Sequence, residues 1–550
     1  MKKIMKRLVS VALVLMLLLI PFSYLLNVKA LDIATTNVSG KDVVSNTSTV
    51  NVTGVGDGDT LGAYKILDAL YNKTSNEITY QFTSLFEAFQ ASEYATNDGK
   101  DFSSASFDVD NYLAFGKTDM TEDETKNFEL LYTQFAKYVK AQGTSVVASA
   151  TLTATAGTTV AVASNVAVGS YLILPVSTTR IYSAMIANVA IVAEGGAWKL
   201  EDPIVVAAKS TAISDVFPSG DDEQGGQGKA KSIISKEIAT ASVVQGEEYI
   251  YIVNTPLPAY PTNASNTKFT ITETLDKGVE FKGFDKMYIS DGVYSDAAAV
   301  QGTADGKFVK DGKTIATATS STNEDGTTTI VINFTYAQLE GKEVEIHYSA
   351  DLALGTDIAY GTEYKSKSVL TYSVDPYGTA TKTTNASIAS ALTYGFKVNN
   401  IKKGDNNTKL VGAKFALYKV DSKGDKTGDP IATAEYKDGT VVFDRGIAAT
   451  NTDTTYRLVQ TAAPAGYTLA SEKGVILNIK NTTENFDDGA VYYDSDNKTF
   501  IVTVANTEAG LLPATGGLGT ILYTLIGLFI ITFSATAVVY YRKKKNATNE

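Results

Sequence analysis

Short runs in which apolar and polar residues alternate recur along this chain, and they constrain its fold more than any other feature. YIYIVNTPLP, KFTITETLDKGVEF, TTTIVINFTY, KEVEIHYSADL and SVLTYSVDP follow one another between residues 249 and 376. Successive side chains of a strand point to opposite faces of a sheet, so this alternation predicts strands with one buried face. Short strands separated by turn residues predict a mainly β fold of immunoglobulin-like sandwiches.

Turn-rich segments divide the chain into regions that we expect to be separate domains. The segment FPSGDDEQGGQGKAK, residues 217–231, clusters glycine, proline and charge, which is typical of a linker. We therefore predict an N-terminal domain over residues 31–216, a second domain over 232–391 and a smaller third domain over 392–508. Three domains agree with the length of the chain, at roughly 150 residues per domain.

The N-terminal domain is expected to contain some helix as well as strands. In TEDETKNFELLYTQFAKYVKAQG, Thr121 and Glu124 have the spacing of a capping box. Large apolar residues then recur at helical spacing, at Phe128, Leu131, Phe135 and Tyr138. This aromatic stripe is expected to face the core.

Residues 1–30 have the pattern of an export signal. Four basic residues within the first seven precede a long apolar run, and VKA then offers small residues where a signal peptidase cuts, after Ala30. The alternative is a retained membrane anchor, but Pro21 and the polar residues that follow Ala30 favour removal.

The C-terminus carries a second apolar run, residues 518–541, which is long enough to cross a bilayer as a helix. The basic tail that follows, residues 542–550, is expected to stay on the cytoplasmic side. LPATG stands directly before the run and matches the Leu-Pro-x-Thr-Gly sorting signal of Gram-positive surface proteins; its residues are Leu512, Pro513, Ala514, Thr515 and Gly516. The motif alone is weak evidence for a sorting signal, whereas its combination with an apolar span and a basic tail is strong evidence.

This match implies a defined course of processing. A sortase, which is a cysteine transpeptidase, would cut between Thr515 and Gly516, hold the carbonyl of Thr515 as a thioester and pass it to an amine. The apolar run would hold the chain at the membrane only until that cut. The mature protein would then be a secreted, wall-anchored protein without a transmembrane helix.

Composition excludes several classes of function. The chain has no cysteine and one histidine, His347, so it has almost no material for Cys/His or Ser/His/Asp catalysis and no second histidine with which to build a metal site. Removal of both ends would take away nine basic residues and one acidic residue and change the net charge from −12 to −20. Such an acidic surface argues against nucleic acid as a partner. We predict no cofactor and no metal.

Several segments together resemble the backbone pilins of Gram-positive bacteria. They are FTITETLDKGVEF, LTYSVDPYG, LTYGFKVNN, KLVGAKFALYKVDSKG, YRLVQTAAPAGY and the sorting signal. The resemblance implies tandem immunoglobulin-like and collagen-adhesin B-like domains. It also implies that a pilin sortase joins the threonine of one subunit to a lysine of the next copy and that the fibre is attached to peptidoglycan. Minor pilins and a host surface ligand are further partners that it allows.

The resemblance also implies an acceptor lysine near the end of the first domain. PIVVAAKST occupies the matching place and keeps Lys209, although it lacks the proline and asparagine that usually flank such a lysine. Lys229 and Lys231 in the linker are rivals. The simpler interpretation is a solvated lysine at the end of a strand.

A third implication is an internal amide bond between a lysine and an asparagine, assisted by a buried acid. In the second domain Lys236 and Glu273 stand in the places of the lysine and the acid, but Ser366 stands where the asparagine is expected. Burial raises the pKa of such an acid and lowers that of the lysine. Because serine has no amide to attack, the usual bond cannot form at this position.

The third domain departs further from that pattern. Asn400 stands in the place of the lysine, Gln460 in the place of the acid, and Asn506 alone keeps its expected role. Strand alternation makes Lys402 the nearest lysine expected to point inward. We predict that the usual bond of this domain is absent.

Two other functions remain open. The chain could be a monomeric wall-anchored adhesin, in which Lys209 is incidental. An extracellular enzyme is a remote third reading, because the paired acids Asp221 and Asp222 lie in the Gly-rich linker and are most simply solvated charge.

Overall fold

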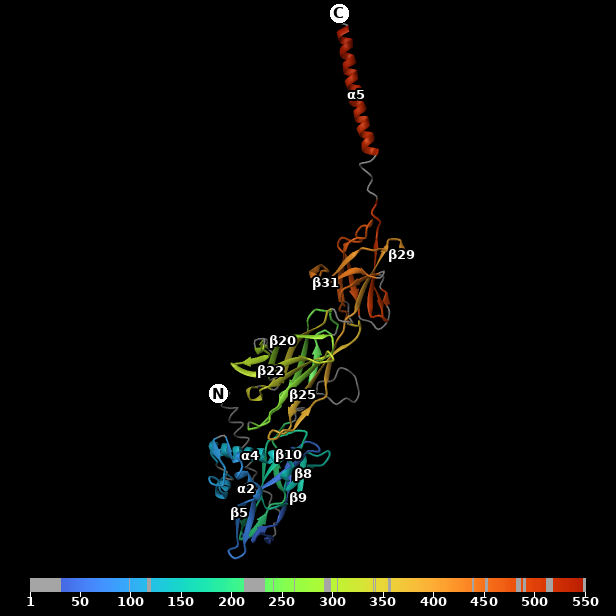
Figure 1. Cartoon of the computed structure of the whole chain (residues 1–550). Coiled ribbons are helices and arrows are strands. Elements are labelled where there is room, and N and C mark those ends of the chain that lie inside the picture. Colours follow the sequence, from blue (N-terminus) through green and yellow to red (C-terminus); the bar gives the residue numbers. More distant parts are fainter. Residues whose placement is uncertain are drawn as a thin grey trace. The chain divides into compact units, whose positions relative to one another are not determined.

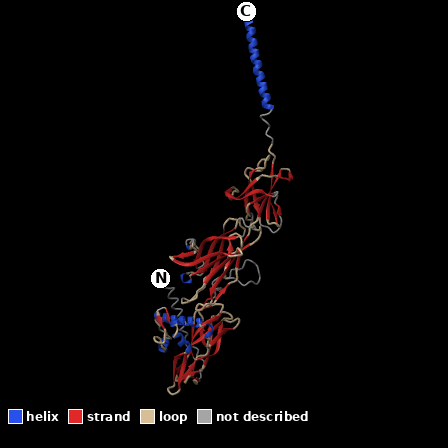
Figure 2. Cartoon of the chain, in the orientation of Figure 1, coloured by secondary structure: helices blue, strands red, loops and turns tan. Residues whose placement is uncertain are grey.

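The computed structural model confirms a mainly β protein, with 52% strand and 15% helix. Apart from the C-terminal helix, strands make up most of the cartoon in Figure 2, and the α-helices occur in the N-terminal part and at the C-terminus. The signal 1–30, the linker 217–231 and the sorting motif 512–516 lie outside the described residues. The structure describes residues 31–97, 99–115, 120–211, 233–240, 242–261, 263–290, 298–303, 305–339, 341, 343–354, 358–437, 440–450, 454–480, 486–487, 491–510 and 518–547.

The chain forms two compact units. The first consists of Met1–Thr240, Glu248–Ala353 and Tyr364–Ala391. The second consists of Ala241–Glu247, Leu354–Glu363 and Leu392–Glu550. Within the described residues, the strands of the first unit form one set of sheets up to residue 211 and another set from residue 235 onward. The strands from residue 395 onward form a further sheet.

The N-terminal part of the first unit is built on a 10-stranded sheet, which Figure 1 shows in blue and cyan. Its long strand β4 (Thr60–Asn72) pairs antiparallel with β10 (Gly169–Ser177), as the apolar runs in both segments lead one to expect. The other strands are β1 (Thr35–Val38), β2 (Lys41–Val44), β3 (Thr47–Thr53), β5 (Glu77–Phe82), β8 (Ala150–Ala154), β9 (Val160–Ala167), β12 (Met185–Val189) and β15 (Ile204–Ala207). Shorter pairs join β6 (Thr96–Asn97) to β7 (Lys100–Asp101), β11 (Ile181–Tyr182) to β16 (Ser210–Thr211), and β13 (Ile191–Glu194) to β14 (Ala197–Leu200).

Helices cover one face of this sheet. The predicted helix is α4 (Glu122–Ala141), and its capping box between Thr121 and Glu124 is present. The buried side of α4 packs with β4 and β10 in one cluster, which includes Leu131, Phe135, Tyr138, Tyr64, Ile66, Leu172 and Leu174. Alternate residues of β4 enter a second cluster on the opposite face, so β4 is buried on both sides. The other helices are α2 (Ser84–Gln90), η1 (Glu93–Ala95), α3 (Val109–Ala114) and η2 (Gly143–Ser145).

The remainder of the first unit is a two-sheet sandwich. One sheet has the order β17 (Ser235–Ile238), β18 (Tyr249–Pro256), β24 (Glu343–Leu352) and β20 (Val279–Ser290). The other has the order β21 (Lys307–Lys310), β22 (Lys313–Thr322), β23 (Thr328–Phe334), β19 (Phe269–Leu275), β25 (Tyr364–Ser373) and β26 (Thr381–Thr383), with β27 (Ser387–Ala391) also on β25 and the short helix η5 (Tyr336–Gln338) after β23. Alternation buries Ile271 and Leu275 of β19, and Glu273 lies between them at an equally buried position.

The second unit contains a 10-stranded sheet that encloses its own apolar core. The neighbouring strands β28 (Gly395–Lys402) and β37 (Thr499–Asn506) run parallel. The full order is β34 (Val475–Ile479), β33 (Thr454–Ala462), β30 (Lys414–Val420), β31 (Lys426–Lys437), β32 (Thr440–Phe443), β28, β37, β36 (Val491–Asp494) and β35 (Phe486–Asp487), with β29 (Asp405–Lys409) also on β28.

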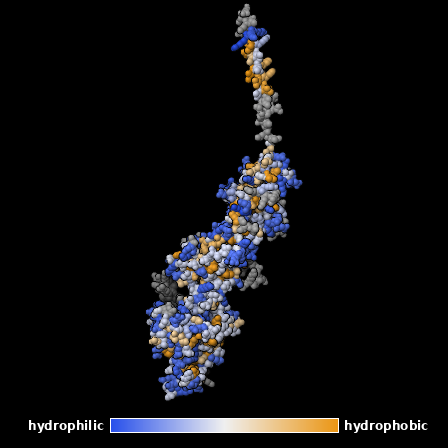
Figure 3. All heavy atoms as spheres, in the orientation of Figure 1, coloured by the Kyte–Doolittle hydropathy of each residue, from blue (hydrophilic) through white to orange (hydrophobic). Residues whose placement is uncertain are grey.

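The C-terminal helix α5 (Leu518–Ala547) contains the predicted apolar span. Thr524–Lys544 is long and apolar enough to cross a membrane, with a mean hydropathy of 1.8 and none of its most apolar window buried. Figure 3 shows the apolar side chains exposed along the helix, followed by hydrophilic residues near its C-terminal end.

Candidate functional site

Lys209 lies in the short connection between β15 and β16. This connection is close to residue 211, where the described N-terminal part of the first unit ends. The side chain of Lys209 is exposed, whereas its backbone is held. The carbonyl of Lys209 accepts a hydrogen bond from the Ser183 amide at 3.0 Å, and the preceding amide of Ala208 donates to the carbonyl of Thr53 at 2.8 Å. Lys209 therefore presents a primary amine to solvent from a fixed backbone. The rivals Lys229 and Lys231 lie outside the described residues.

Lys236 is buried inside the sandwich of the first unit. Its Nζ donates to the carboxylate of Glu273, and both side chains are 0% exposed. The same Nζ lies 2.5 Å from the hydroxyl of Tyr348, which in turn lies 3.0 Å from Oε2 of Glu273. Lys236 and Tyr348 come from one sheet (β17 and β24), and Glu273 comes from the other (β19). These three groups join the two sheets through the core.

Burial decides the electrostatics of this cluster. It lowers the pKa of Lys236, and the adjacent Glu273 carboxylate opposes that shift. Burial and the same carboxylate raise the pKa of Tyr348 well above its usual value, so the phenol keeps its proton. The rings of Tyr251 and Tyr348 each lie 4.6 Å from Nζ of Lys236, which favours the ammonium through cation–π attraction.

Ser366 completes the cluster without supplying an acyl carbon. Its side chain is fully buried on β25, and its hydroxyl lies 2.9 Å from that of Tyr348. The structure thus brings Lys236, Glu273 and Ser366 together. Sequence reasoning did not single out Tyr348, which links Ser366 to the other two. The alternation in VEIHYSADL could have identified Tyr348 as a buried residue, because it puts Tyr348 on the same face of the strand as Ile346.

Gln460 and Asn506 form a reciprocal pair of carboxamides in the second unit. Nδ2 of Asn506 donates to Oε1 of Gln460 at 2.9 Å, and Nε2 of Gln460 donates to Oδ1 of Asn506 at 3.2 Å. Both side chains are buried. Gln460 lies on β33 and Asn506 at the end of β37, which are not neighbours in the sheet order. The pair therefore joins separate strands of the curved sheet through its interior.

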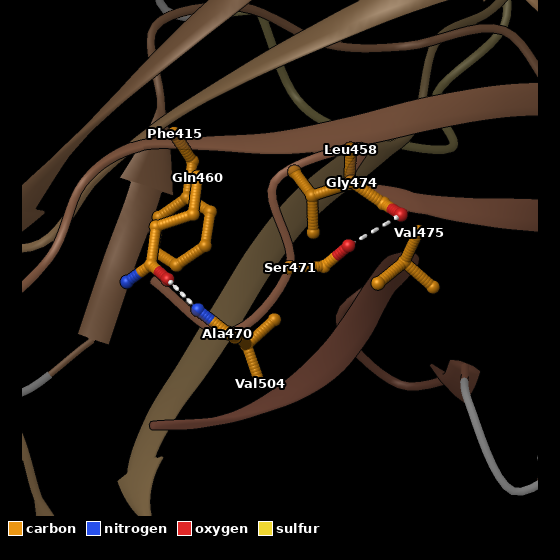
Figure 4. A pocket seen from close by; sticks show the side chains of 8 residues that line it. All are labelled: Phe415, Leu458, Gln460, Ala470, Ser471, Gly474, Val475 and Val504. Carbon is orange, nitrogen blue, oxygen red and sulfur yellow. Dashed lines mark hydrogen bonds between the residues drawn. The ribbon is translucent and has the colours of Figure 1, made fainter. Parts of the chain in front are cut away.

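Backbone groups satisfy the rest of this amide pair. The amide of Ala470 donates to Oε1 of Gln460 at 2.8 Å, and Nδ2 of Asn506 also donates to the carbonyl of Thr468 at 2.7 Å. Figure 4 shows Gln460 bonded to Ala470 at one end of a small pocket, and Ser471 bonded to Gly474 at the other end. The pocket is otherwise apolar, with Phe415, Leu458, Val475 and Val504 among its lining residues.

The two other candidates on β28 do not join this pair by any described hydrogen bond. Asn400 is buried, and its Nδ2 lies 3.5 Å from the carbonyl of Leu410. Lys402 does not point inward as predicted, because its Nζ lies 2.6 Å from the carboxylate of Glu508 at a partly exposed position. The pairing of β28 with β29 shifts register between Ile401 and Lys402, which interrupts the alternation on which the prediction rested.

His347 has an ordinary structural environment on β24. Its Nε2 lies 2.6 Å from Oε1 of Glu345, and its ring packs against Tyr288. Within the part of the chain that the structure describes, no group of three or more His, Cys, Asp or Glu residues is arranged to hold a metal ion. The cleavage residue Ala30 and the motif from Leu512 to Gly516 lie outside that part.

Two family models match the chain. The model described as the prealbumin-like fold domain SpaA matches residues 397–489, which include most of the sheet of the second unit. The model described as the LPXTG cell wall anchor motif matches residues 505–548, which include the sorting motif, the apolar helix and most of the basic tail. The chain therefore carries a cell-wall anchor, and its apolar helix fits a transient membrane-spanning precursor. Comparison with curated proteins gives no match.

Solved structures of two pilins align with most of this chain. The T6 backbone pilin of serotype M6 Streptococcus pyogenes, a modular three-domain structure, aligns over 85% of this chain and 100% of its own, with 15% identity and a TM-score of 0.50. The full-length major pilin SpaD from Corynebacterium diphtheriae aligns over 85% of this chain and 98% of its own, with 16% identity and a TM-score of 0.47. At these identities, the likeness to T6 establishes a shared fold of tandem β domains.

Proposed function

We propose that this cell-wall-anchored protein is the structural subunit of a covalently polymerised pilus on a Gram-positive surface. The observation that carries the proposal is the combination of an LPXTG anchor with tandem β domains that share the fold of a backbone pilin. A sortase would cut between Thr515 and Gly516 and join Thr515 to Lys209 of the next copy. At the base of the fibre, Thr515 would be joined to peptidoglycan.

The chemistry of the joining step is an acyl transfer. The sortase thiolate attacks the carbonyl of Thr515, the bond to Gly516 breaks, and the new amino terminus of Gly516 leaves with a proton. The neutral amine of Lys209 then attacks the thioester. An amide forms, the thiolate leaves, and the proton from the amine passes to a base of the sortase. The exposed side chain of Lys209 supports its role as the nucleophile.

The protein would be the substrate of this reaction rather than its catalyst. The solved structures that share its fold are structural proteins, and the two reacting groups, a main-chain carbonyl and a lysine amine, need an external transpeptidase. Stability along the fibre would then come from the folded units and from the links between copies.

Inside each unit, we propose that non-covalent clusters replace the internal amide bond. In the first unit Ser366 offers a hydroxyl where a carboxamide would be needed. In the second unit Gln460 and Asn506 satisfy one another as an amide pair, and Lys402 is bound to Glu508. These contacts occupy the groups that would otherwise react.

A wall-anchored monomer is the second candidate function. It is favoured by the flanks of Lys209, since PIVVAAKST lacks the proline and asparagine of the expected acceptor motif. In that case Thr515 would be joined only to peptidoglycan, and Lys209 would be an ordinary surface residue.

Expression of the full-length chain in a Gram-positive host with a pilin sortase separates the two functions. A pilus subunit gives a ladder of covalent multimers that survives boiling in detergent, and Lys209→Arg abolishes the ladder because a guanidinium stays protonated and does not attack. Lys100→Arg, at another exposed lysine of the same unit, is the matched control and keeps the ladder. A wall-linked monomer without any ladder in the unmodified chain would support the monomeric adhesin instead.

A further inference from the structure

We propose that the buried carboxylate of Asp59 is a positioning residue for polymerisation, which holds the backbone around Lys209 so that its amine is presented to the sortase thioester. This inference rests on the proposed function and adds to it a residue far from Lys209 in sequence. The residues involved all lie in the part of the first unit before residue 212.

Asp59 is a charged side chain enclosed by hydrogen-bond donors. Its exposure is 1%, and a bare carboxylate at such a position would be costly. Oδ1 accepts from the amide of Thr179 at 2.6 Å and from its hydroxyl at 2.8 Å. Oδ2 accepts from the hydroxyl of Tyr182 and from the amide of Gly56 at 3.2 Å. Asp59 thus fastens the loop after β3 to the segment between β10 and β11.

The space around Asp59 allows no larger residue at position 56. A Cβ on Gly56 would lie 2.7 Å from Oδ2 of Asp59 and would also collide with the hydroxyl of Thr179. The Gly56 amide donates to the Tyr182 hydroxyl as well, at 2.8 Å. The loop is therefore shaped closely around this one carboxylate.

Tyr182 connects Asp59 to the β15–β16 connection that contains Lys209. The side chain of Tyr182 is fully buried, and its residue pairs directly with Ser210 where β11 meets β16. The next amide along, that of Ser183, donates to the carbonyl of Lys209 at 3.0 Å. Fixing the phenol of Tyr182 therefore fixes the strand against which Lys209 is hydrogen-bonded.

The end of β3 and the loop after it hold the same connection from its other side. The hydroxyl of Ser210 donates to the carbonyl of Gly54 at 3.0 Å, and the amide of Ala208 donates to the carbonyl of Thr53 at 2.8 Å. Ala208 is thus bound to the end of β3, and Ser210 is bound to the loop that Asp59 closes. The side chain of Lys209 remains exposed while its backbone is restrained on both sides.

Restraint of this kind matters for a reaction between two large partners. The amine has to meet a thioester inside another protein, and a misplacement of about 1 Å can lower a rate about a hundredfold. Loss of the Asp59 contacts would let the connection around Lys209 move. Joining of Thr515 to peptidoglycan does not use Lys209, so it would be unaffected.

The test compares two products of the same exported chain. Full-length Asp59→Asn is expressed together with the pilin sortase. This substitution replaces one carboxylate oxygen by an NH₂ group, which donates at a place where the carboxylate accepted hydrogen bonds from Gly56 or Tyr182. We expect a fall of at least tenfold in multimers relative to wall-linked monomer, and faster amide hydrogen exchange over residues 208–211. Asp57→Asn, at an exposed position of the same loop, is the control and leaves both unchanged.

Tyr182→Phe tests the same link with a smaller disturbance, since it removes only the hydroxyl. It should lower the multimer ratio in the same direction, and the double variant should be no worse than Asp59→Asn alone. An unchanged ratio in both single variants, while Lys209→Arg abolishes the ladder, overturns the inference and leaves the proposed function standing. An equal loss of multimer and wall-linked monomer also overturns it, because that marks a general folding defect. A ladder that survives in Lys209→Arg overturns both the inference and Lys209 as the acceptor.

Discussion

Nζ of Lys236 donates a hydrogen bond to the carboxylate of Glu273 in the core of the first unit, and neither side chain has any exposed surface. The pair bridges the two sheets of the sandwich together with Tyr348. Ser366 is also fully buried, and its hydroxyl contacts the Tyr348 hydroxyl, which in turn contacts both members of the pair. The amine of Lys236 and the acid of Glu273 thus lie near Ser366, whose side chain has no carbonyl carbon for the amine to attack.

Ser366→Asn should create an internal amide bond. Nζ of Lys236 would attack the new carboxamide, the C–N bond to the amide nitrogen would break, and ammonia would leave with a proton relayed by Glu273. The intact mass of the folded variant should therefore be lower than its sequence mass by one ammonia. The double variant Ser366→Asn with Glu273→Gln lacks the proton carrier and should keep its full mass. A full mass in the single variant would show that Ser366 is not placed for reaction.

Removing one member of the Lys236–Glu273 pair should be far worse than removing both. Lys236→Met leaves a buried carboxylate without its cation, which costs about 3–5 kcal/mol in the free energy of unfolding. Lys236→Met with Glu273→Leu removes both charges and should recover most of that loss. Denaturant unfolding of the three proteins measures the difference, and equal stabilities of the single and double variants would contradict the prediction.

Asp202 should make the folding stability of the N-terminal sheet region depend on pH in the acid range. Hydrogen bonds from the Thr49 amide at 2.8 Å and from the Ser48 hydroxyl at 3.0 Å lower the pKa of Asp202. Because the folded pKa lies below the unfolded one, the stabilisation is present above the unfolded pKa and is lost as the pH falls through the folded pKa. Asp202→Asn should thus be less stable than the parent at pH 7, and the difference should shrink in acid. A constant difference at all pH values would contradict this.

The amide pair of the second unit should be worth a measurable amount of stability. Gln460→Leu removes the acceptor of the Ala470 amide and leaves part of the Asn506 amide unpaired, at a cost of about 1–3 kcal/mol for each buried group left unsatisfied. Thr461→Val changes the exposed neighbour on β33 and is the matched control. The free energy of unfolding of the second unit, followed by denaturant titration, should fall for Gln460→Leu alone.

Much of this arrangement could be predicted from local patterns. Alternation identified strands of the first unit between residues 249 and 376, and the capping box of Thr121 and Glu124 marked the start of α4. The places of Lys236, Glu273 and Ser366 followed from resemblance to a family, and the structure brings these residues together.

The remainder depends on contacts that no local pattern encodes. Alternation assumes an unbroken strand, so the shift in register after Ile401 reversed the expected direction of Lys402. The reciprocal bonds of Gln460 and Asn506 join strands that are 46 residues apart in sequence. The enclosure of Asp59 needs donors from positions 120 or more residues away. Such sites are visible only once the chain is folded.

The most direct test of the central claim is the identity of the bond between copies. Multimers purified from the cell wall would be digested, and the branched peptide that joins two copies would be sequenced by mass spectrometry. We predict an amide between the carbonyl of Thr515 and Nζ of Lys209. A branch at another lysine would contradict the assignment of Lys209, and a wall fraction that contains only single copies joined to peptidoglycan would contradict polymerisation itself.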